Sequence, residues 1–68
     1  MKVNVKILSG GVKEETVEVS SDAKYEDILS SLHINPEIVI VFSNGNPVPL
    51  DEKVEAGDIK ILRVVTGG

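Results

Sequence analysis

Cysteine is absent from this 68-residue chain. Disulfides, thiolate metal sites and a catalytic thiol are therefore excluded, and a reducing, cytoplasmic setting fits best. No apolar run approaches the roughly 18 residues that a membrane-spanning helix needs, and no continuous apolar segment follows Met1 and Lys2 as it would in an export signal. We therefore expect a soluble cytoplasmic protein with no membrane partner.

Aromatic and basic residues are also scarce. Tyr25 and Phe42 are the only aromatic residues, which leaves no platform on which nucleic-acid bases could stack. Seven basic residues against eleven acidic ones give a net charge of −4, which disfavours binding to a phosphate backbone. We expect no nucleic-acid partner. A chain of this length makes one small domain, residues 1–68, with little room for an enzyme pocket.

Residue patterns that carry catalysis or metal binding are missing as well. His33 is the only histidine, and without cysteine or a second histidine it is not expected to bind a metal. Glu26 and Asp27 are adjacent, so on a helix they diverge by about 100° and do not form an acid/base pair. Gly10-Gly11 precedes a strand-like segment, which indicates a hairpin turn and not a phosphate-binding loop. We expect no catalytic residue, no metal and no bound cofactor.

The first half of the chain predicts a hairpin followed by a helix. Apolar residues alternate with polar ones in residues 2–7 and again in 17–19, with glycines between the two segments, so two strands should pair back on each other. Ser20-Ser21-Asp22 then supplies capping side chains for a helix over about residues 24–32. Its apolar stripe has helical spacing and consists of Tyr25, Ile28, Leu29 and Leu32.

The second half predicts three more strands. Asn35-Pro36 ends the helical region, and the β-branched run 38–42 suits a central strand. Asn44-Gly45 favours a tight reversal, the prolines in 47–49 allow only a short edge strand, and a last strand runs over residues 57–65. The class is therefore α+β, with one helix covering one face of a mixed sheet.

Strand alternation predicts a docking patch on the uncovered sheet face. If Ile38, Ile40 and Phe42 face the helix, and Ile59 and Ile61 do the same on the last strand, the residues between them point away. The uncovered face would then carry Val39, Val41, Leu62 and Val64. Scattered exposed apolar residues also occur on proteins without any partner.

The chain ends in Gly67-Gly68, directly after the apolar run 59–65 and Thr66. Glycine has no side chain, so such a tail can lie extended in a channel too narrow for any Cβ and deliver its carboxylate to a distant active site. From Val64 the reach is roughly 15 Å at about 3.3 Å per residue. We interpret residues 63–68 as a substrate handle, in which Gly67 and Gly68 are activated and Arg63, Val64, Val65 and Thr66 contact the partner. A frayed end is the alternative.

These features together resemble the β-grasp ubiquitin-like proteins, particularly the prokaryotic sulfur carriers of thiamin and molybdopterin synthesis and the small archaeal modifiers. The matching elements are the run 38–45, which ends in Asn44-Gly45, then Val48-Pro49, Gly57-Asp58 before the last strand, and Gly67-Gly68. The resemblance covers nearly the whole chain. It implies a β-grasp fold with a mixed four- to five-stranded sheet and one helix packed on one face.

The resemblance also implies a function. In that family an enzyme related to ubiquitin-activating enzymes uses ATP to adenylate the terminal glycine, here Gly68, and the protein itself is not an enzyme. The carboxylate then becomes a thiocarboxylate or is joined to a lysine amine. Ubiquitin's arginine-rich tail is reduced here to Arg63, which favours a sulfur carrier for cofactor or tRNA synthesis, with a sulfur acceptor or synthase subunit as second partner. The alternatives are a modifier of target-protein lysines and a plain β-grasp binding module, including an RNA-binding one.

Overall fold

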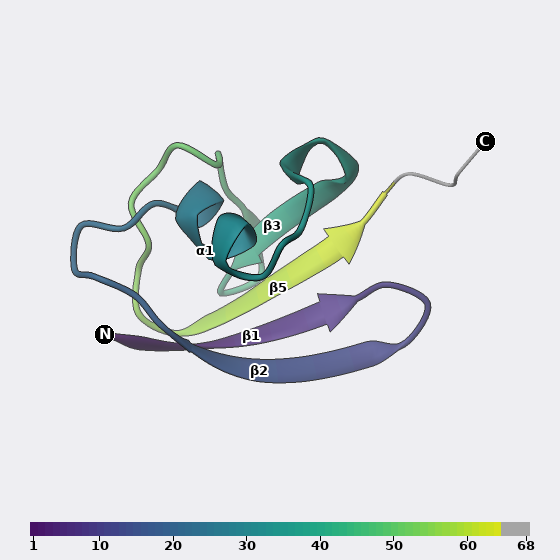
Figure 1. Cartoon of the computed structure of the whole chain (residues 1–68), viewed down its shortest axis with the longest axis horizontal. Coiled ribbons are helices and arrows are strands. Elements are labelled where there is room, and N and C mark those ends of the chain that lie inside the picture. Colours follow the sequence, from purple (N-terminus) through teal and green to yellow (C-terminus); the bar gives the residue numbers. More distant parts are fainter. Residues whose placement is uncertain (65–68) are drawn as a thin grey trace.

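The computed structural model describes residues 1–64 and shows one α-helix packed across one face of a five-stranded mixed sheet (Figure 1). The strand order is β2-β1-β5-β3-β4, in which β1 and β5 are parallel and the other neighbours antiparallel. The α+β class and the single covering helix are confirmed. The elements are β1 (Lys2–Leu8), β2 (Val12–Glu18), α1 (Tyr25–Ser31), the 3₁₀ turn η1 (Pro36–Ile38), β3 (Val39–Ser43), β4 (Asn46–Pro47) and β5 (Asp58–Arg63).

The β1–β2 hairpin follows the predicted alternation. Val3 and Val5 are buried against the helix, while Lys2 and Lys6 point to the other face. Gly10 adopts a φ of 72° in the connecting turn, a conformation in which an L side chain is strained. The antiparallel register runs without interruption from Lys2 opposite Glu18 to Leu8 opposite Val12. The helix side of the hairpin is therefore apolar along β1 and at Val17, whereas Glu15 and Lys13 of β2 lie on that same side, opposite Val5 and Ile7.

The loop that precedes β5 hydrogen-bonds to the N-terminus of helix α1. The Tyr25 N–H donates to the Glu52 carbonyl at 3.2 Å and the Glu26 N–H to the Leu50 carbonyl at 3.0 Å. These are first-turn N–H groups, which have no partner within a helix. The Tyr25 hydroxyl in turn accepts from the Glu55 N–H at 3.2 Å. The loop before β5 thus satisfies the helix start and positions the helix over the sheet.

The core lies between α1 and the inner face of the sheet. The helix contributes Tyr25, Ile28 and Leu29, and the central strand β5 contributes Ile59 and Ile61, all almost fully buried. Burying a large apolar side chain stabilises a fold by about 1.5–3 kcal/mol. The apolar stripe predicted for the helix is therefore confirmed as its core-facing side.

One predicted strand phase is wrong. Val41 is only 2% exposed and Val39 packs against the core, whereas Ile40 is 41% exposed on the outer face. Phe42 shares that outer face, because residues i and i+2 of a strand lie on the same side. The pairing of β3 with β5 determines which β3 residues face the core, because Val41 lies opposite the buried Ile61. Every residue from 38 to 42 is apolar, so polarity carries no information about phase in this strand.

Candidate docking face

The sheet face that α1 leaves uncovered, here called the open face, carries a row of apolar side chains from three strands. Leu8, Leu62 and Ile40 are neighbours across β1, β5 and β3, since the register pairs Leu8 with Leu62 and Leu62 with Ile40. Ile40 and Leu62 are 41% and 36% exposed. Side chains directly opposite each other on one sheet face are within contact distance. These three residues, the apolar row, form a continuous stripe in which Ile40 and Leu62 are exposed and Leu8 is half-buried.

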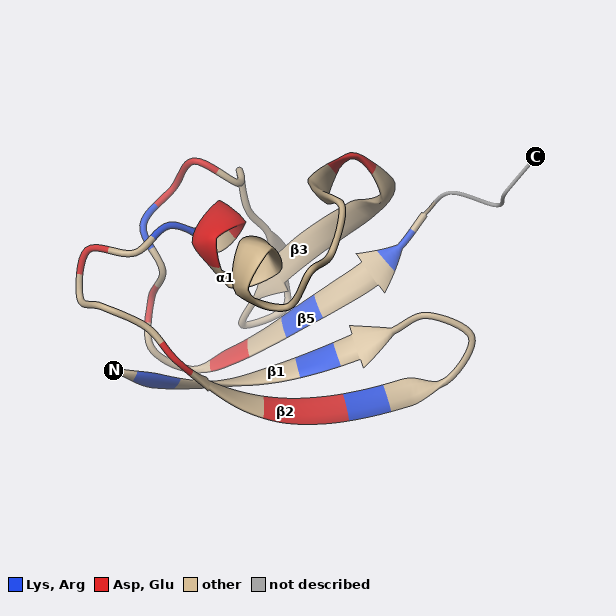
Figure 2. Ribbon diagram, viewed as in Figure 1, with Lys and Arg blue, Asp and Glu red and all other residues tan. Residues whose placement is uncertain are grey.

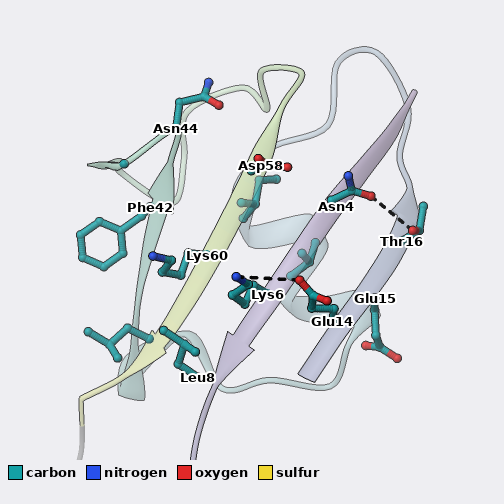
Figure 3. A pocket seen from close by; sticks show the side chains of 14 residues that line it. Asn4, Lys6, Leu8, Glu14, Glu15, Thr16, Phe42, Asn44, Asp58 and Lys60 are labelled. Carbon is teal, nitrogen blue, oxygen red and sulfur yellow. Dashed lines mark hydrogen bonds and ion pairs between the residues drawn. The ribbon is translucent and has the colours of Figure 1, made fainter. Parts of the chain in front are cut away.

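The next row along the sheet combines an aromatic ring with two ammonium groups. Phe42 lies opposite Lys60, and Lys60 lies opposite Lys6 (Figure 3). The Lys6 Nζ is 3.8 Å from Glu14 Oε1, an exposed ion pair of a kind that contributes at most about 1 kcal/mol. The centre of the open face therefore presents positive charge beside the apolar row.

Acidic and neutral polar groups border this centre. Figure 2 shows the acidic segment of β2 at the edge of the sheet, next to β1, with β5 on the far side of β1. At the other end of the face, Thr16 Oγ1 donates to Asn4 Oδ1 at 3.3 Å, and Asp58 lies beside Asn4 in the register. A shallow hollow of about 950 Å³ runs over these residues, from Phe42 and Leu62 to Thr16. A partner that offers an apolar surface with an acidic group beside it complements this face.

The predicted patch residues divide between the two faces. Leu62 is exposed on the open face as predicted, and Val64 is exposed immediately beyond β5. Val39 and Val41 belong to the inner face, so they are not part of an open-face patch. Arg63 lies opposite Val39 and therefore shares the helix side of the sheet.

Three residues of the open face were missed in the sequence: Leu8, Ile40 and Phe42. The alternation of Val3, Val5 and Ile7 toward the core already implies that Leu8 points the other way, so that residue could have been found. Ile40 and Phe42 could not, because β3 is apolar on both faces.

The Gly-Gly end lies beyond the described residues. Strand β5 ends at Arg63, and the Val64 N–H donates to the Ile38 carbonyl at 2.9 Å, which anchors the last described residue beside η1. Val65, Thr66, Gly67 and Gly68 lie outside the described residues, and their roles stay predictions. Leu62, the central residue of the apolar row, precedes Val64 by two residues in sequence. A partner on the open face is therefore placed next to the start of the tail.

Neither a metal-binding cluster nor a membrane-spanning helix is found within residues 1–64. No group of three or more His, Asp or Glu side chains gathers there in an arrangement that could hold a metal ion. In the same part of the chain, no helix has both the length and the apolar character needed to cross a membrane.

Comparison with known proteins places the chain in a family. The family profile of small archaeal modifier protein 2 matches residues 1–65. The chain is 35% identical to small archaeal modifier protein 2 of Haloferax volcanii and 44% identical to an uncharacterized protein of Archaeoglobus fulgidus, each over 68 residues that cover both proteins completely.

Solved structures share the fold at lower sequence identity. SAMP1 from Haloferax volcanii superimposes with a TM-score of 0.75 at 21% identity, over all of both chains. A ubiquitin from Caldiarchaeum subterraneum gives 0.74 at 18% identity, over all of this chain and 98% of the other. These two likenesses confirm the β-grasp fold that the resemblance implied. The profile match and the 35% identical relative show that this chain belongs to the ubiquitin-like small archaeal modifier family.

Proposed function

We propose that the carboxylate of Gly68 is the functional group and that an enzyme related to ubiquitin-activating enzymes adenylates it with ATP. The observation that carries this proposal is the apolar row, Leu8, Leu62 and Ile40, whose central residue Leu62 is exposed on β5, the strand that leads into the Gly-Gly end. A carboxylate is a poor electrophile until it is activated. Docking on the open face holds the molecule while the tail, with a reach of about 15 Å, enters the enzyme.

The open face suits such a docking role because it joins apolar area to charge. Large apolar side chains that stay exposed in a contiguous group mark interaction sites more often than isolated ones do. Lys6 and Lys60 lie beside the apolar row and add attraction for an acidic partner surface. Complementary charges of this kind mainly speed association and select the partner.

We further propose that the activated carboxylate is passed to lysine amines of other proteins. The support is the family: the matching profile and the Haloferax relative both carry the name of a modifier. Attack by the amine forms an isopeptide bond, expels AMP and releases a proton. In this reading the protein is a substrate throughout, and its partners are the adenylating enzyme and the target proteins.

A sulfur carrier is the second candidate. In this chain Val64, Val65 and Thr66 precede the glycines, where ubiquitin has a basic residue, and this favours the short sulfur carriers. Attack by a sulfide donor on the same acyl-adenylate expels AMP and forms a thiocarboxylate. The sulfur would then pass to an acceptor or synthase subunit for cofactor or tRNA synthesis.

Mass spectrometry distinguishes these outcomes. It is applied to protein isolated from its native cells and to protein incubated with ATP, sulfide and the adenylating enzyme. For a modifier we expect peptides from cellular proteins with a Gly-Gly remnant on lysine. For a carrier we expect the mass of the intact protein to increase by the difference between sulfur and oxygen, and the same increase on its C-terminal peptide. If the protein is still adenylated after Gly68 is deleted or after a residue is added beyond it, both the modifier and the sulfur-carrier proposals are wrong.

A further inference from the structure

A second cleft lies on the helix side of the sheet, at the base of the tail. Its walls are the segment after α1 on one side and the ends of β1, β3 and β5 on the other. The apolar lining includes Ile34, Ile38 and Val39, all half-buried, and the rim carries His33 and Arg63. The cleft measures about 310 Å³, the lower end of the range of about 300–1,000 Å³ that holds small ligands. It is sized for one or two apolar side chains.

The cleft exists because the helix stops early. Helix α1 ends at Ser31, and His33 takes a left-handed conformation with a φ of 59°, after which Ile34 packs against the core. The Ile34 N–H donates to the Leu29 carbonyl at 2.9 Å and the His33 N–H to the Ser30 carbonyl at 3.1 Å, which fixes this turn. The helix therefore does not extend over the C-terminal end of β5. Ile38 is half-buried there, but it is not among the residues packed against the core.

The rim of the cleft carries a positive charge. Arg63 is the charged residue among those that line the cleft, although the chain as a whole has a net charge of −4. Arg63 carries a permanent positive charge with five N–H donors. Within residues 1–64 the ion pairs are Lys6 with Glu14 and Lys13 with Glu15, so Arg63 takes part in neither. Glu37 belongs to the adjacent turn η1, but it is exposed and does not line the cleft.

We infer that this cleft binds a protein segment in which an apolar side chain is flanked by acidic residues. The apolar side chain enters between Ile34 and Ile38, and a flanking carboxylate accepts hydrogen bonds from Arg63. Leu62 and Arg63 are consecutive in β5 and point to opposite faces, so this segment and a partner on the open face contact different sides of the same strand. The inference therefore stands independently of the proposed function of Gly68.

The test uses the full chain and two capped peptides, one with two leucines flanked on both sides by aspartates and one with lysines in place of the aspartates. Binding is followed by amide NMR, and contacts by nuclear Overhauser effects from the leucine methyl groups. We expect saturable binding of the acidic peptide with contacts to Ile34 and Ile38. Arg63→Glu should weaken this binding about fivefold, as expected when an exposed pair is lost. Ile38→Asp should weaken it by about tenfold or more.

Matched controls lie on the open face. Ile40→Asp and Lys60→Glu make the same chemical changes on exposed side chains there, and they should leave peptide binding unchanged. If Ile38→Asp unfolds the domain, Arg63→Glu still tests the inference, because Arg63 is exposed and its substitution leaves the core unchanged. The inference is overturned if the leucines contact Ile40 or Leu62, if the lysine peptide binds equally well, or if no saturable binding occurs up to the solubility limit of the peptide.

Discussion

His33 holds a backbone conformation that costs free energy. Its φ of 59° places it in the left-handed region, where an L residue other than glycine is disfavoured by about 1–2 kcal/mol. Glycine avoids this cost but loses about 0.5–1 kcal/mol through the greater freedom of the unfolded chain. We therefore predict that His33→Gly raises the free energy of unfolding by about 0.5–1 kcal/mol and that His33→Val lowers it. Urea unfolding measures both, and a valine variant at least as stable as the wild type would contradict the prediction.

Gly67 and Gly10 are predicted to be glycines for different reasons: Gly67 for adenylation and Gly10 for the stability of the fold. Gly67 is proposed to pass through a channel that excludes side chains, so Gly67→Val should stop adenylation without changing the thermal midpoint. Gly10 has a φ of 72° and open space around its Cα, so Gly10→Val should lower stability by about 1–2 kcal/mol through backbone strain, while the folded protein is still adenylated. Pyrophosphate release and thermal unfolding give the two measurements. Normal adenylation of Gly67→Val would rule out the narrow channel.

At the scale of elements, what the sequence could predict depended on how clearly polarity marked each strand. In β1 and β5, polar or charged residues alternate with valines or isoleucines, so their inner faces were predicted correctly. In β3 every outer and inner position up to Phe42 is apolar, and the one polar residue, Ser43, is buried at 6% exposure. The phase of that strand depends on its pairing with β5, which is a nonlocal contact that alternation does not report. The docking face could therefore be located, but Ile40 and Phe42 could not be assigned to it.

The phase of β3 makes a direct stability prediction. Val41→Asp places a charge in the core between the sheet and α1, where it has no partner, and should destabilise the fold by more than 4 kcal/mol, enough to unfold a domain of this size. Ile40→Asp changes an adjacent side chain that is 41% exposed and should cost less than about 1 kcal/mol. Circular dichroism with urea unfolding compares them. If Ile40→Asp unfolds the domain and Val41→Asp does not, the register of β3 with β5 is wrong.

At the scale of the whole molecule, the sheet separates two surfaces that meet at β5. The open face carries the apolar row with Lys60, and the helix side carries the core and, at the end of β5, the cleft beside Arg63. The strand between them runs directly into the residues that the proposed chemistry uses. In the proposed function, a domain of 68 residues thus offers separate surfaces to two proteins while the proposed reactive group, the Gly68 carboxylate, lies beyond both surfaces in sequence.

This arrangement predicts that docking and chemistry can be separated by mutation. Leu62→Asp removes the centre of the apolar row and faces an acidic partner with a like charge, so adenylation at limiting concentrations of this protein should fall about tenfold or more. Saturating concentrations should recover most of the rate, because Gly68 is unchanged. Thr16→Asp adds the same charge to the same face, but on the edge strand β2, away from the apolar row, and should change the rate less than about twofold. Equal losses in the two variants would mean that net charge governs the encounter. No loss in Leu62→Asp would move the docking surface off the open face.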